Sequence, residues 1–131
     1  MKILSLLVSN KVSVNDDTKN ITIEGVFDSI GAFTFPAKHK ELTVSLITQG
    51  IAGKHYFKIS IMKGNKELAA VDKEALTGIS HRFIANFYDV VFPEPGTYTI
   101  KAIADKEKLT TDINLNLLKQ TSKLWTWLLN Q

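Results

Sequence analysis

The chain has 131 residues, of which 44% are hydrophobic and 22% charged, and its formal net charge is +3 at pH 7. This length and composition are typical of one soluble globular domain with a sizeable core. The absence of cysteine excludes disulfide bonds, thiolate nucleophiles and cysteine-ligated metal sites, and it suits a reducing cytoplasm.

Charge and hydropathy also bear on partners and location. Arg82 is the only arginine, and bidentate recognition of guanine or phosphate favours arginine over lysine, so we expect no nucleic-acid binding. The apolar run in MKILSLLVSNK is too short for a secretory signal. No segment reaches the roughly 20 apolar residues of a membrane span. We therefore expect a cytoplasmic protein.

Apolar and polar residues alternate along most of the chain, as where Leu42, Val44 and Leu46 are separated by Thr43 and Ser45. Alternation of this kind predicts strands with one face on a core and the other in water. Turn signals separate the runs, as in KGNKE, where a Gly-Asn pair suits a tight hairpin. The predicted strands lie near residues 2–9, 20–28, 41–48, 54–63, 66–72, 80–91, 97–104 and 109–117.

The segment VVFPEPGTYTIKAIAD, residues 90–105, predicts a corner between two strands. Pro93 and Pro95 cannot donate to a strand ladder, and Gly96 permits a tight bend just before Tyr98 begins the next strand. In immunoglobulin-like sandwiches a tyrosine in this place ties its hydroxyl to the corner backbone. We therefore predict a scaffold role for Tyr98 and an all-β, immunoglobulin-like antiparallel β-sandwich of seven or eight strands.

Three short motifs follow one another along the chain. They are Gly-x-Phe-Asp-x-Ile at residues 25–30, Phe-Pro-x-x-His at 35–39 and Phe-Pro-x-Pro-Gly-x-Tyr at 92–98. With these motifs, residues 1–117 resemble a bacterial family of short uncharacterised proteins, a domain of unknown function. The resemblance implies a small antiparallel β-sandwich. It supplies no activity and no catalytic residue to carry over.

Patterns of metal binding and catalysis are missing from the sequence. His39, His55 and His81 have no second histidine or carboxylate at the spacing of a local ligand pair. The chain also lacks a Gly-x-Ser-x-Gly elbow and a phosphate-binding loop, and Asp16 and Asp17 begin a loop without the closing glutamate of a calcium site. We predict no metal, no cofactor and no enzymatic activity.

Asp28 ends the second predicted strand and precedes the aromatic loop SIGAFTFPAKH. In the favoured interpretation it is an Asx-type turn residue whose carboxylate caps backbone amides. In the other, the carboxylate joins Phe33, Phe35 and His39 in a binding rim, because loops on a rigid scaffold concentrate binding residues. That second interpretation gives an alternative function, a small-molecule binder or unrecognised hydrolase with its site near Asp28 and His39.

Residues 119–131 form a tail that the family pattern does not explain, so we divide the chain into a sandwich domain, 1–118, and this tail. A short helix is predicted in it, with Trp125 and Trp127 among several leucines. So short a helix is marginal alone and must dock on something.

The sequence leaves three docking partners for the tail open. The first is its own sandwich. The second is another copy of the chain or another protein, since tryptophan is favoured in interface anchors. The third is a membrane surface, which the short segment disfavours. The predicted function is a non-enzymatic binding or assembly module that acts through loops, a sheet edge or the Trp-rich tail.

Overall fold

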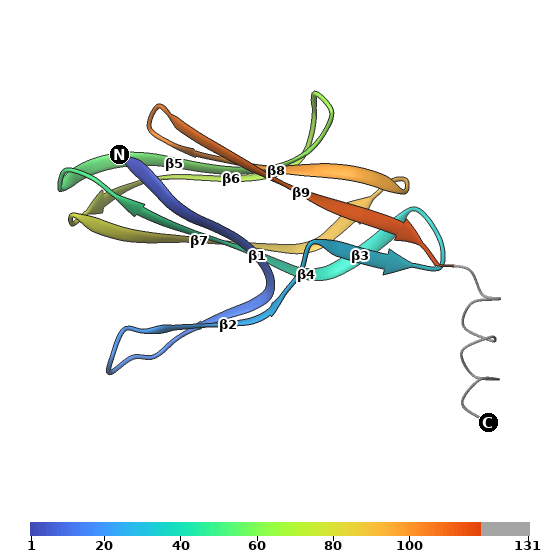
Figure 1. Cartoon of the computed structure of the whole chain (residues 1–131), viewed down its shortest axis with the longest axis horizontal. Helices are drawn as coiled ribbons and strands as arrows, with labels where there is room; N and C mark the ends of the chain where they lie inside the picture. The colour runs from blue at the N-terminus through green and yellow to red at the C-terminus, as the bar shows by residue number, and fades with distance from the viewer. Residues whose placement is uncertain (119–131) are drawn as a thin grey trace.

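The computed structural model describes residues 1–118, and these residues form nine strands and no helix (Figure 1). The strands build two sheets that pack face to face, one with the order β2-β1-β4-β7 and the other with the order β3-β9-β8-β5-β6. The strands are β1 (Lys2–Val14), β2 (Ile21–Val26), β3 (Ser29–Ala32), β4 (Ala37–Gln49), β5 (Gly53–Lys63), β6 (Lys66–Thr77), β7 (Ser80–Phe92), β8 (Gly96–Ala104) and β9 (Glu107–Leu117).

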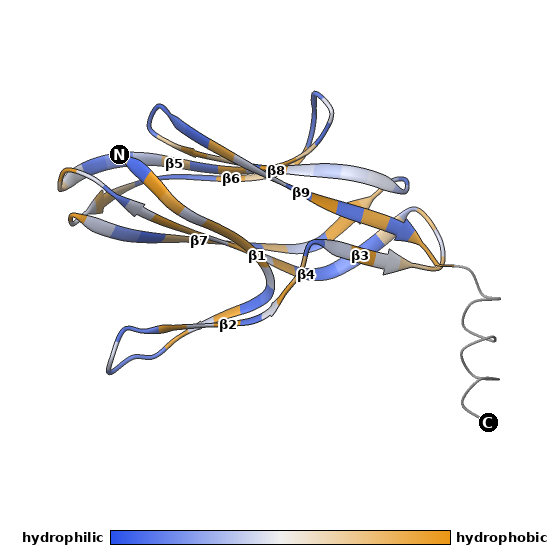
Figure 2. Cartoon of the chain, in the orientation of Figure 1, coloured by the Kyte–Doolittle hydropathy of each residue, from blue (hydrophilic) through white to orange (hydrophobic). Residues whose placement is uncertain are grey.

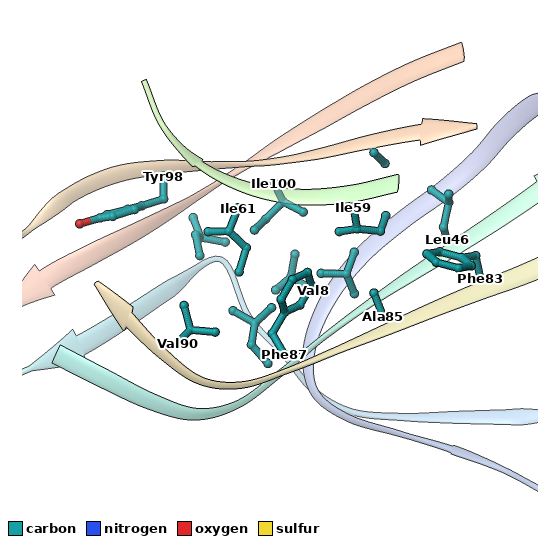
Figure 3. Packing of buried hydrophobic residues seen from close by; sticks show 14 of the residues in the cluster. Val8, Leu46, Ile59, Ile61, Phe83, Ala85, Phe87, Val90, Tyr98 and Ile100 are labelled. Carbon is teal, nitrogen blue, oxygen red and sulfur yellow. The ribbon is translucent and has the colours of Figure 1, made fainter. Parts of the chain in front are cut away.

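The core lies between the sheets and is made by every second residue of the inner strands (Figure 3). Leu46 of β4, Ile59 of β5 and Ile100 of β8 are fully buried there. Phe57 of β5 stacks on Phe83 of β7 with ring centroids 5.2 Å apart, which joins the two sheets directly. The alternation in the sequence therefore identified the core faces correctly, and the colouring by hydropathy follows the same pattern along the strands (Figure 2).

The predicted corner is confirmed. Tyr98 is fully buried, and its hydroxyl donates to the Glu94 carbonyl oxygen at 2.5 Å while the Glu94 backbone N–H donates to the hydroxyl oxygen at 3.2 Å. The ring meets Phe92 edge-on at 5.0 Å, and the Lys63 ammonium lies 4.7 Å from the ring centroid. The short loop between β7 and β8 is thus held by one side chain from within the core.

Two predictions about the strands need correction. The sequence indicated eight strands, but a further four-residue strand, β3, forms inside the aromatic loop, where its brevity hides any alternation. The sandwich is also not purely antiparallel, because β3 pairs with β9 in parallel while the other pairings are antiparallel. The chain crosses from one sheet to the other after β2, so β3 reaches its neighbour without the reversal that a hairpin would impose.

The outer face of the four-stranded sheet differs from the prediction as well. Ser9, Thr43 and Ser45 were expected in water or at a strand end, yet all three are buried. The reason is that β1 continues to Val14 and curls with β2 into a hairpin beneath this sheet (Figure 1). The Arg82 guanidinium donates to the carbonyl oxygen of Lys19 near the hairpin tip, which ties the hairpin to β7.

The predicted helix in residues 119–131, with Trp125 and Trp127, lies outside the described residues. Within residues 1–118, the structure contains no helix of the length and apolarity that crossing a membrane requires.

Candidate binding surface at the β1–β9 groove

One side of the sandwich carries two strand edges that are only partly paired. β2 pairs with β1 from residue 9 onward, and β3 pairs with β9 from residue 114 onward. The first halves of β1 and β9 therefore present open edges on the same side of the molecule. Between them lies an open hollow of about 330 Å³, the β1–β9 groove, lined by Leu6, Leu7, Val8, Val26, Phe27, Asp28, Thr111, Asp112 and Ile113.

The segment that links the two sheets forms one end of this groove. The Phe27 backbone N–H donates to the Val8 carbonyl oxygen at 3.1 Å, and the Asn114 backbone N–H donates to the Asp28 carbonyl oxygen at 2.9 Å. The crossover is thus hydrogen-bonded to both sheets. Phe27 also packs against the core, so the groove has a fixed wall.

The groove is lined mainly by apolar residues, with Asp28 at one end, and the Asp112 carboxylate lies beside it on the outer face of the five-stranded sheet. Leu7 is 37% exposed and Val26 is 58% exposed, which is high for large aliphatic residues beside a core. Asp112 accepts a hydrogen bond from the Thr99 hydroxyl at 3.0 Å. Apolar walls with a few placed polar groups are typical of binding sites.

Asp28 is exposed, and within residues 1–118 its carboxylate accepts no hydrogen bond. The favoured sequence interpretation, a carboxylate that caps backbone amides, is therefore wrong. The backbone carbonyl of Asp28 makes the local contact instead, because the crossover directs it at β9. Asp28 is one of the residues that line the groove.

The open edge of β9 has backbone groups ready for a further strand. The N–H of Asn114 points at the crossover and β3, and hydrogen-bonding directions alternate along a strand, so those of Lys108, Thr110 and Asp112 point to the same side. The hairpin register with β8 is regular over this stretch. Within the described chain, no strand pairs with this edge at residues 107–113.

A comparison with known protein families assigns the sandwich to one family. The family model described as "Family of unknown function (DUF6941)" matches residues 4–117. The chain belongs to this family. The match spans nearly all of the nine-stranded sandwich and confirms the resemblance to a domain of unknown function. No curated protein and no solved structure matches the chain.

Among the described residues, Phe33, Phe35 and His39 do not line the groove with Asp28, and Trp125 and Trp127 lie outside the described residues. Phe35 packs against the core, and Phe33 is 47% exposed on the loop between β3 and β4. His39, on β4, lies half-buried against Phe27, with ring centroids 5.6 Å apart. The expected rim is thus divided, because the crossover carries Asp28 to β9 while β4 holds His39.

Burial lowers the pKa of His39, against the opposing effect of a hydrogen bond with the Glu41 backbone. Within residues 1–118, its Nε2 atom is buried without a hydrogen-bond partner. Burial thus favours the neutral imidazole. Its contact with Phe27 makes it a supporting residue behind the crossover.

Sequence reasoning missed an interaction between His55 and Asp105. The His55 Nδ1 lies 2.5 Å from one Asp105 carboxylate oxygen, and Nε2 lies 2.6 Å from the Ile51 carbonyl oxygen. The second Asp105 oxygen accepts the Tyr56 backbone N–H at 2.9 Å. The two residues are 50 positions apart, so no local spacing could reveal the pair.

The electrostatics of this pair are those of a structural clamp. The Ile51 carbonyl, and then Asp105, raise the pKa of His55, while the Tyr56 N–H, and then His55, lower the pKa of Asp105. Both ring nitrogens point at acceptors, which favours an imidazolium that donates twice. The ring joins the β4–β5 loop to the β8–β9 turn and has no free nitrogen for catalysis or metal binding.

The third histidine, His81, lies against Phe57 with ring centroids 5.1 Å apart, and burial lowers its pKa. Within residues 1–118, no three histidine or carboxylate side chains are arranged to hold a metal ion. The three histidines thus serve separate parts of the described sandwich.

Proposed function

We propose that this protein is a non-enzymatic binding module that takes an extended peptide segment on the β1–β9 side. The observation that carries the proposal is the open edge of β9 at residues 107–113 beside an apolar groove. An incoming strand would pair with β9 at residues 107–113, on the same edge where β3 pairs with residues 114–117. Strand addition of this kind draws affinity from backbone hydrogen bonds and specificity from alternate side chains.

The chemistry of the groove specifies the segment. Leu6 and Phe27 offer apolar contact in the groove, and the carboxylates of Asp28 at its end and Asp112 beside it offer a partner for a cation. A strand with apolar residues on one face and a lysine or arginine among them suits this lining. Opposite charge at the rim also steers association and excludes acidic segments.

The sandwich fold, the lack of cysteine and the two tryptophans add to the proposal. Two sheets that pack face to face and the Tyr98 corner support an immunoglobulin-like sandwich, a scaffold whose edges and loops commonly carry binding. The lack of cysteine supports a cytoplasmic setting. Trp125 and Trp127 add a second candidate contact with a protein partner or another copy, because tryptophan is enriched in interface anchors.

A second candidate is a small cationic molecule in the same groove. Its volume, about 330 Å³, is at the lower end for ligand pockets, roughly 300–1,000 Å³, and Asp28 lies at its end. A hydrolase centred on Asp28 and His39 has less support, because His39 is not among the described residues that line the groove.

The test is selection from a displayed library of random nine-residue peptides on the intact chain. Thr110→Pro removes a backbone N–H that faces the open edge and leaves the β8 ladder intact, whereas Thr110→Val keeps that N–H. We expect enriched peptides with alternating apolar residues and a basic residue, bound by wild type and Thr110→Val but lost with Thr110→Pro. Peptides that bind all three proteins equally would refute strand addition, and so would a failure to enrich any at protein concentrations where the chain is monomeric.

A further inference from the structure

Two copies of the open β9 edge match each other in strand register and in charge when they are paired antiparallel. We infer that this edge pairs with the β9 edge of a second copy of this chain, antiparallel about a two-fold axis at Thr110. This inference rests on the proposed use of the β9 edge and names its partner. The two five-stranded sheets would then join into one continuous sheet.

The register follows from which backbone groups face the edge. Lys108, Thr110 and Asp112 direct their N–H and carbonyl groups outward, and in an antiparallel pair such residues must lie opposite one another. The open stretch, residues 107–113, has Thr110 at its centre. A two-fold axis there uses the whole open edge. A shift toward the C-terminus would meet the residues already paired with β3, and a shift toward the N-terminus would reach the β8–β9 turn.

This register sets opposite charges across the junction. With Thr110 opposite Thr110 of the second copy, Lys108 lies opposite Asp112 of the second copy, and symmetry repeats the pair. Directly opposed residues share one face of a sheet, and opposite charges there stabilise the pairing while like charges weaken it. The Thr99 hydroxyl occupies one Asp112 oxygen and leaves the other for an ammonium group.

The inner face of the junction is compatible with the same pairing. Leu109 is 40% exposed in the single chain and would lie opposite Thr111 of the second copy, beside the groove. Open edges are normally protected by charged side chains, proline or irregular backbone. The β7 edge has such an irregularity at Asp89, whose φ is 54°. The β9 edge instead is regular, and the residues whose backbone groups face outward carry one charge of each sign, Lys108 and Asp112, which permits self-pairing.

The experiment measures the dissociation constant of the full chain by sedimentation equilibrium. We expect a reversible dimer in the wild type. Lys108→Asp and Asp112→Lys each place like charges opposite one another twice, and each should weaken association about ten-fold or more. The double variant that exchanges the two charges should restore it. Thr110→Pro should abolish it and Thr110→Val should not, with melting curves showing that each variant is folded.

Several results would overturn the inference. One is a wild type that stays monomeric at high protein concentration, and another is a dimer indifferent to both charge reversals. A third is an exchange variant no tighter than the single variants. A dimer lost on deleting residues 119–131 but unaffected by Thr110→Pro would assign association to the tail. A monomeric protein that still binds peptides in a Thr110→Pro-sensitive way would reject the dimer and leave the proposed function standing.

Discussion

Removing the Tyr98 hydroxyl isolates the contribution of the corner. In Tyr98→Phe the ring keeps its edge contact with Phe92 and its contact with the Lys63 ammonium, while both hydrogen bonds to Glu94 disappear. Glu94 is exposed, so water can reach its freed backbone groups and limit the loss. We expect the free energy of unfolding to fall by about 1–2 kcal/mol. For a chain of this length that corresponds to roughly 4–7 °C in melting temperature.

The assay is equilibrium urea unfolding of wild type, Tyr98→Phe and Tyr98→Ala. The alanine variant removes a fully buried ring and should cost about 3–5 kcal/mol, which sets the scale for packing alone. A loss below about 0.5 kcal/mol in Tyr98→Phe would show that the hydroxyl does not hold the corner. If that variant kept full stability and lost a measured binding partner, the scaffold interpretation of Tyr98 would be refuted.

Three further predictions concern pH, metal and the tail. The pKa of His55 is raised on folding, so its stabilising effect is complete below its unfolded pKa near 6.5 and is lost as the pH rises through the folded pKa. The pKa of Asp105 is lowered, so its effect is present above its unfolded pKa near 3.8 and is lost as the pH falls through the folded pKa. His55→Gln should therefore destabilise the protein most at about pH 5 and little at pH 9 in urea unfolding, and equal losses at both would contradict the clamp. Dialysis against a strong chelator should leave the melting temperature unchanged, whereas stoichiometric zinc lost together with stability would contradict this. Deleting residues 119–131 should leave the sandwich folded, since its strands complete their pairing by residue 117, but should lower stability or oligomeric state; unchanged melting and mass would show that the tail contributes to neither.

The candidate site was predictable only in part. Asp28 could be singled out because it follows an alternating segment and precedes an aromatic loop, and the structure places it in the groove. Its neighbours could not be predicted. Asp112 and Thr111 lie more than 80 positions away along the chain, and only the crossover to β9 brings them beside Asp28.

The sequence by itself determined the features that depend on neighbouring residues. Alternation with a period of two assigned the core faces of the strands, and the Pro-Gly-Tyr segment assigned the corner, because each rests on backbone geometry within a few positions. The tertiary structure decided what depends on distant segments. It placed β3 parallel to β9, buried Thr43 and Ser45 beneath a curled hairpin, and brought His55 to Asp105. These outcomes depend on how the sheets and loops meet in space, a relation between distant segments that local patterns do not contain.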